Sequence, residues 1–263
     1  MIGRKKLLSF VALLSVLLIV PLVFSFGVVD VSQFSLGSSP SSSMVEPASP
    51  GPTTVFVDPV NILDDTKQSG SLVSFHVNVS DVTDLFTWQV NVTWDTAILN
   101  FTRIVSYGDF LAQTTSLYGT SRIVDIVDAS NDTGYAAVAE TILGEYPGIT
   151  GSGRLLTIEF LVVGYGSTDL TISISGTLST MLLDSAGSSI TYGTTDGYFR
   201  NKYPGDVNGD YLVGVADFSA LAGAYGSSSG QPTYDREADF NLDDLVGVAD
   251  FSTLAGNYGK TFP

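Results

Sequence analysis

One acidic segment occurs twice near the C-terminus, and it constrains the fold more than any other feature. "DVNGDYLVGVADF" begins at Asp206, and "DFNLDDLVGVADF" begins at Asp239, 33 residues later. Between residues 214–226 and 247–259, 11 of 13 positions are identical. This duplication predicts a tail made of two copies of one loop-helix unit.

Oxygen donors recur at alternate positions of each copy, and a further carboxylate follows eleven residues after the first. In a tight loop this spacing turns successive side chains toward one point. Oxygen ligands without nitrogen or sulfur favour calcium over zinc or copper, so we expect two Ca²⁺ sites. The candidate ligands, with a backbone carbonyl at each leucine, are Asp206, Asn208, Asp210, Leu212 and Asp217 in the first loop and Asp239, Asn241, Asp243, Leu245 and Asp250 in the second.

Three positions depart from an ideal calcium loop of this length. Position six, which requires a sharp turn, holds Tyr211 in the first loop and Asp244 in the second. Tyrosine tolerates positive φ poorly, so the first loop is predicted to be the weaker site. Position nine is Gly214 or Gly247, which leaves that ligand to water, and the closing residue is Asp rather than the longer Glu.

Each loop leads into a short helical pattern with apolar residues at i, i+3, i+4 and i+7, and each pattern stops at a glycine, Gly226 or Gly259. Val213 and Val246 are expected to fill a core between the loops. Residues 203–263 carry nine acids and two bases, so two Ca²⁺ would relieve self-repulsion and contribute to folding. A single Asp-rich run is also typical of a solvated turn, but two copies with matched spacing argue against that interpretation. The periodic residues are Phe218, Leu221, Ala222 and Tyr225, and Phe251, Leu254, Ala255 and Tyr258.

Residues 53–200 have the alternating pattern of an all-β domain. "SFHVNVS" and "FTWQVNVTW" each place apolar side chains on one face of a strand, and Trp88 and Trp94 lie on the apolar face. "RLLTIEFLVV" and "DLTISIS" add strands, with turns at "YPGITGSG" and "GYGST". Many short strands predict a β-sandwich.

The N-terminus indicates export. Residues 1–27 place Arg4, Lys5 and Lys6 before a 20-residue uncharged run, which is either a signal peptide or an uncleaved membrane anchor. Residues 28–52 are a Ser- and Pro-rich linker.

The chain has no cysteine, so it has no disulfide and no thiolate metal site. With 27 acids against 11 bases it is not expected to bind nucleic acid. Four N-x-Ser/Thr sequons are candidate glycosylation sites, at Asn78, Asn91, Asn100 and Asn131.

The tail, residues 203–263, closely resembles a dockerin module, because its paired "D-x-N-x-D" loops each lead into a short helix. The preceding segment, residues 53–200, resembles a cohesin module. Its matching stretches are "TVFVDPV", "VSFHVNVSDVTDLFTWQVNVTWDTAILNF", "GDFL", "GITGSGRLLTIEFLV" and "LTISISGTLSTMLLDSAGSSI". The resemblance implies a mainly β protein, with a cohesin-like jelly-roll sandwich followed by a small all-α calcium-binding dockerin.

In these families a dockerin that is ordered by calcium binds a cohesin sandwich through one helix face. The resemblance therefore implies a secreted or cell-surface scaffolding protein in assemblies linked to polysaccharide binding or breakdown. Its partners would be dockerin-bearing and cohesin-bearing proteins, including other copies of itself, and it would meet a membrane only through an uncleaved N-terminal segment. The family's partner-recognition positions correspond to Val215 and Ala216 in one copy and Val248 and Ala249 in the other.

Three other functions have less support in the sequence. The sandwich could bind carbohydrate, with the calcium tail serving only structure; this requires exposed aromatic rings, whereas Trp88 and Trp94 follow the core pattern. Hydrolysis is not expected, because few Glu occur, no segment remains for a cleft, and the lone His76 has no evident partner. A passive surface protein with a calcium-binding tail stays an open alternative.

Overall fold

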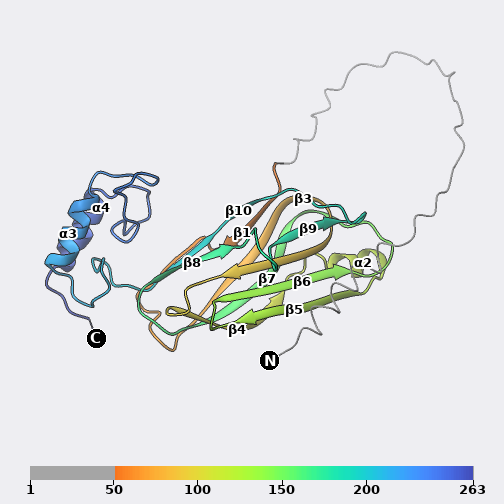
Figure 1. Cartoon of the computed structure of the whole chain (residues 1–263), viewed down its shortest axis with the longest axis horizontal. Coiled ribbons are helices and arrows are strands. Elements are labelled where there is room, and N and C mark those ends of the chain that lie inside the picture. The colour runs from red at the N-terminus through yellow and green to blue at the C-terminus, as the bar shows by residue number, and fades with distance from the viewer. Residues whose placement is uncertain (1–50, 263) are drawn as a thin grey trace, which may run out of the picture. The chain divides into compact units, whose positions relative to one another are not determined.

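The structure is a computed structural model that describes residues 51–262 (Figure 1). The predicted signal or anchor and nearly all of the linker lie outside these residues. Among the helices of residues 51–262, none has the length and apolar character needed to span a membrane. The elements are β1 (Thr54–Asp58), β2 (Asn61–Leu63), β3 (Leu72–Thr93), β4 (Leu99–Tyr107), α2 (Gln113–Tyr118), β5 (Arg122–Ser130), β6 (Tyr135–Ile142), β7 (Ile149–Val162), β8 (Ser167–Ile172), β9 (Met181–Asp184), β10 (Gly193–Thr195), β11 (Gly197–Arg200), α3 (Val215–Ala224) and α4 (Val248–Asn257).

Strand β3 organises the sandwich because it is 22 residues long and pairs with five other strands. Its first half pairs with β1 and β7, and its second half pairs with β6, β8 and β9. The sequence predicted two strands here, but the structure has one strand that is bent by register shifts between Val79 and Leu85. Asp84 stands in the bend at φ 57°, and its carboxylate accepts hydrogen bonds from the Gly148 N–H at 2.6 Å and the Ser185 hydroxyl at 2.6 Å.

The predicted apolar faces of β3 form the core, and Trp88 and Trp94 are 0% and 7% exposed. Alternation predicted one buried face for the second half, but the opposite face is buried too. Thr87, Gln89 and Asn91 are each at most 8% exposed. Strand β9 pairs with this part of β3, and Gln89 donates to the carbonyl of Ser179 at 2.8 Å.

Two local features of the sandwich differ from the sequence prediction. The six-residue helix α2 follows β4 without a helical periodicity in the sequence. The segment 146–153, predicted to be a turn, supplies residues 149–153 to β7. There Gly151 adopts φ 133°, a conformation that favours glycine inside an irregular stretch of strand.

The tail has its own small core, separate from that of the sandwich. Val213 and Val246 are both fully buried in it, as the sequence predicted. Helices α3 and α4 are followed by Gly226 and Gly259 at φ 79° and 82°, which confirms the predicted stops. The buried core consists of Val207, Val213, Leu221, Ala224, Ala238, Val246 and Leu254.

The two repeats close on each other through backbone hydrogen bonds. Val213 donates to the carbonyl of Lys260 at 3.0 Å and accepts from the N–H of Gly259 at 2.8 Å. Val246, at the equivalent position, donates to Ser227 at 3.0 Å and accepts from Gly226 at 2.8 Å. Each loop is therefore tied to the segment that follows the other repeat's helix, and the tail has approximate two-fold symmetry.

Candidate metal loops and helix face

The first loop brings together the carboxylates that its spacing predicted to converge. Ligand atoms of Asp206, Asp210 and Asp217 all lie within 4.8 Å of one another. Asp217 is at the third position of α3, and its two carboxylate oxygens accept from the N–H groups of Val207 and Gly214, both at 2.8 Å. The start of the helix thus fixes the last carboxylate of the loop.

The second loop repeats most of the hydrogen bonds of the first, although among the described residues only the first loop's three carboxylates have ligand atoms within 4.8 Å of one another. Asp250 accepts from the N–H groups of Phe240 at 2.7 Å and Gly247 at 2.8 Å. Asn241 donates to Asp243 at 2.9 Å, as Asn208 does to Asp210 in the first loop at 2.9 Å. Leu212 and Leu245, the predicted carbonyl ligands, donate their N–H groups to the carboxylates at position five, at 2.9 and 3.1 Å.

The charge of the loops fits a cation. Asp206, Asp217, Asp239 and Asp250 are each at most 1% exposed. None of the ion pairs within residues 51–262 involves them. Buried carboxylates without a basic partner are costly, and a hard divalent cation is the partner that all-oxygen donors prefer. In both loops the donor set therefore fits Ca²⁺, whose binding stays a prediction.

Both loops carry backbone strain, which the sequence predicted at position six but not at position four. Tyr211 and Asp244, at position six, adopt φ 68° and 67°. At position four the first loop has Gly209 at φ 77°, whereas the second has Leu242 at φ 53°. Leucine is as poorly suited to this region as tyrosine. Each loop thus carries one bulky left-handed residue, which removes the reason for expecting the first loop to be weaker.

A tyrosine hydroxyl donates to the first carboxylate of each loop. Tyr165 donates to Asp206 Oδ2 at 2.8 Å, and Tyr234 donates to Asp239 Oδ2 at 2.8 Å. Burial raises the pKa of Tyr165 and of Tyr234 well above the ordinary tyrosine value, and the bonded carboxylates raise each pKa further. Both hydroxyls therefore stay protonated donors at neutral pH. Neither tyrosine lies within the repeated segment, so the sequence pattern did not identify them.

Helices α3 and α4 expose a matched apolar face. The predicted partner-binding residues Val215, Ala216, Val248 and Ala249 are all exposed, and both valines are 69% exposed. The periodic residues Phe218 and Tyr225 are exposed with them, as are their equivalents Phe251 and Tyr258, so the helical pattern describes more than a core.

The two phenylalanines meet between the helices, where the Phe218 and Phe251 rings contact edge to face with centroids 6.4 Å apart. A shallow groove flanks them on each side, and Tyr225 lines one groove and Tyr258 the other. The periodicity of the sequence could have identified this face. Four apolar residues on so short a helix are more than the tail's small core can bury.

The candidate glycosylation sites differ in accessibility. Asn91 is 8% exposed and its backbone N–H donates to Thr180 Oγ1 at 3.1 Å, so its side chain is buried rather than open to solvent. Asn78 and Asn100 are half-buried. Asn131 is exposed, but its amide makes two hydrogen bonds to the backbone of Phe101, at 2.7 and 3.0 Å. His76 contacts Thr157 Oγ1 at 2.8 Å on the strand surface.

Comparison with known proteins identifies the sandwich. The family model described as "Cohesin domain" matches residues 59–198, which is more than half of the chain. A search of curated proteins found no match.

Three solved cohesin structures are similar to part of the chain. A non-cellulosomal cohesin from Archaeoglobus fulgidus is 19% identical with a TM-score of 0.42, over 57% of this chain and 91% of that one. The second type II cohesin module of the ScaA scaffoldin from Acetivibrio cellulolyticus is 20% identical with a TM-score of 0.44, over 56% and 87%. The sixth cohesin of scaffoldin B from the same organism, solved in complex with a Cel5 dockerin, is 19% identical with a TM-score of 0.43, over 58% and 100%. The match of the family model shows that this chain belongs to the cohesin domain family.

Proposed function

We propose that the chain is an exported scaffolding protein that joins other proteins through calcium-dependent cohesin–dockerin pairing. Its sandwich would bind a dockerin on a partner, and its tail would bind a cohesin. Family membership supports a binding module rather than an enzyme. One observation carries the second half of the proposal: two loops of matched sequence and hydrogen bonding each lead into a helix, and together these helices expose one apolar face.

The exposed face has the properties of a binding surface. Val215, Phe218 and Tyr225 and their three equivalents are each between 42% and 69% exposed. An apolar patch of this kind on a small module is costly in water unless a partner covers it. Because the two helices are nearly identical, the face offers a cohesin two equivalent orientations.

Other candidate functions have less support. Carbohydrate binding would need exposed aromatic platforms, and the two tryptophans are buried. A link to polysaccharide breakdown remains part of the proposal only through family analogy. The use of the sequons rests on the sequence motif alone. Since one chain carries both modules, the proposal includes head-to-tail pairing between copies, a contact that need not close into a ring.

Sedimentation of the full chain tests the proposal, over a concentration series with Ca²⁺ and with chelator. We expect the sedimentation coefficient to rise with concentration only in Ca²⁺. The double variant Phe218→Asp/Phe251→Asp should abolish the rise, because each helix alone can pair. Leu72→Asp, which charges an exposed residue at the start of β3, is the matched control and should leave it unchanged.

A chain that stays monomeric would exclude self-pairing. Calorimetric titration against dockerin-bearing and cohesin-bearing proteins of the same source would then decide between an adaptor and a passive surface protein. If neither class of protein binds in a calcium-dependent way, the proposed function is overturned.

A further inference from the structure

The sandwich and the tail belong to one compact unit, Pro52–Pro263, and meet at a buried joint. Glu237 of the tail stands at its centre. Its carboxylate contacts Lys202 Nζ at 2.5 Å, and it accepts hydrogen bonds from Ser167 Oγ at 2.6 Å and from the hydroxyl of Tyr198 at 2.7 Å. Ser167 and Tyr198 come from β8 and β11, so this one carboxylate holds the tail to the end of two neighbouring strands.

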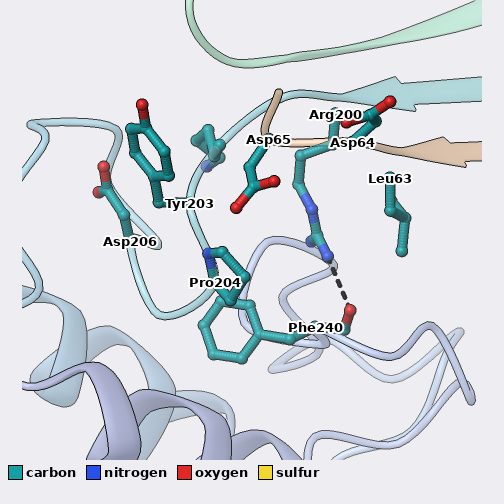
Figure 2. A pocket seen from close by; sticks show the side chains of 9 residues that line it. Leu63, Asp64, Asp65, Arg200, Tyr203, Pro204, Asp206 and Phe240 are labelled. Atoms are coloured by element: carbon teal, nitrogen blue, oxygen red, sulfur yellow. Dashed lines mark hydrogen bonds between the residues drawn. The ribbon is translucent and has the colours of Figure 1, made fainter. Parts of the chain in front are cut away.

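Arg200, the last residue of β11, reaches from the sandwich to the second metal loop. It is 5% exposed, and its guanidinium donates to the carbonyls of Asp239 at 3.2 Å and Phe240 at 3.0 Å. Figure 2 shows this side chain extending past Asp65 to the Phe240 backbone, beside a cavity of about 110 Å³. Asp239 is the first predicted ligand of that loop, so Arg200 fixes the backbone from which the ligand projects.

Tyr165, in the connection between β7 and β8, makes the corresponding contact with the first loop. Its hydroxyl donates to Asp206 Oδ2 and accepts from the N–H of Tyr203, both at 2.8 Å. Its ring stacks on that of Tyr211 with centroids 4.1 Å apart, and Tyr211 is the left-handed residue at position six. One sandwich residue thus orients the first carboxylate and packs against the strained turn.

In each loop a tyrosine hydroxyl donates to the first carboxylate, but the two tyrosines come from different parts of the chain. In the second loop the donor, Tyr234, lies five residues before Asp239 in the tail itself. In the first loop the donor is Tyr165, 41 residues before Asp206 and in the sandwich. Groups that bond to the outer oxygen of a metal ligand fix its orientation, and their loss typically weakens metal binding about 10- to 100-fold.

We propose that Tyr165 and Arg200 are positioning residues through which the sandwich and the calcium loops stabilise each other. Calcium bound in the tail then raises the unfolding temperature of the sandwich. This inference rests on the proposed function only in requiring that the loops bind Ca²⁺. It adds that the tail is not a freely tethered module.

Tryptophan fluorescence of the full chain provides the test, because both tryptophans of the protein, Trp88 and Trp94, lie in the sandwich. The fluorescence therefore reports the unfolding of the sandwich alone. On heating, we expect saturating Ca²⁺ to raise the midpoint by on the order of 5 °C relative to chelator. A tethered, independent tail would bind calcium without moving this midpoint.

Two variants assign the coupling to residues. Tyr165→Phe removes one hydroxyl and keeps the ring stack; we expect it to halve the calcium-induced shift and to weaken one of two calcium sites about 10-fold by calorimetry. Arg200→Met should reduce the shift by acting on the other loop. Tyr192→Phe is the matched control, since it removes a hydroxyl bonded to Thr180 within the sandwich and should retain the full shift.

The outcomes separate this inference from the proposed function. Two bound Ca²⁺ with no shift in the wild-type midpoint would overturn the coupling and leave the proposed function standing. An unchanged shift in both Tyr165→Phe and Arg200→Met would overturn the assignment to these residues. A wild-type chain that binds no Ca²⁺ would overturn the proposed function, and the coupling with it.

Discussion

The sandwich and the tail are stabilised by different means. The sandwich buries about thirty apolar side chains, including Trp88 and Phe160, in one continuous core. The tail buries seven, several of them alanine or valine, and four acidic side chains with no basic partner. Hydrophobic burial is the main source of stability in the first region, whereas in the second the proposed Ca²⁺ would offset the charge. The proposed metal sites would thus compensate for a small core.

Chelation should have the largest effect and should unfold only one of the two regions. Without Ca²⁺ we expect α3 and α4 to unfold, because the buried carboxylates of each loop then lack a counter-ion. Circular dichroism of the full chain should lose its helical contribution and keep its β-sheet contribution. A helical signal that persists in chelator would mean that the tail folds without metal, and the contrast between the regions would fail.

Deletion of core side chains should sharpen the contrast. Phe160→Ala removes a fully buried ring that contacts Trp94 edge to face, with ring centroids 4.9 Å apart. The substitution should lower the free energy of unfolding by about 3–5 kcal/mol with or without Ca²⁺. Leu254→Ala, in the tail, should cost about 2–4 kcal/mol in Ca²⁺ and almost nothing in chelator, where the tail is already unfolded. Denaturant titration in both conditions measures the difference. Equal costs of Leu254→Ala in the two conditions would contradict the interpretation.

A smaller effect is expected from relieving strain in the second loop. Leu242→Gly should stabilise the calcium-bound tail by about 1 kcal/mol, because glycine adopts positive φ without a steric penalty. The measurement is calorimetric affinity at the two sites. Leu245→Gly, three residues later and without positive φ, is the control and should not tighten binding.

The smallest expected effect concerns pH and the bend in β3. Burial would raise the pKa of Asp84, but hydrogen bonds from the Ser185 hydroxyl and from the N–H groups of Gly148 and Ser185 lower it below its ordinary value of 3.8. The ionised carboxylate therefore stabilises the fold above pH 3.8, and this contribution is lost as the pH falls through the lowered pKa.

Asp84→Asn removes this dependence. The difference in midpoint between wild type and Asp84→Asn, followed by tryptophan fluorescence, should be present at pH 6 and should shrink as the pH is lowered below about 4. Asp132→Asn, which changes an exposed aspartate, is the charge-matched control. A difference independent of pH would show that Asp84 acts by geometry rather than charge.

Local features of the fold were predictable from the sequence, and long-range ones were not. The spacing of acids placed Asp206, Asp210 and Asp217 in one loop, and alternation placed Trp88 in the core, because both signals lie within a few residues. The contact between Tyr165 and Asp206 spans 41 residues and follows no period. The backbone N–H of the buried Asn91 donates to Thr180 Oγ1, 89 residues away. Such contacts follow from the assembled fold, and no local pattern encodes them.

The hydrogen bonds between the repeats are nested, and this sets an order for folding during synthesis. The inner pair joins Gly226 and Ser227 to Val246, so it can form once the second loop has left the ribosome. The outer pair joins Val213 to Gly259 and Lys260, which follow the second helix and are translated after the residues of the inner pair. The first loop to be translated is therefore the last to be closed.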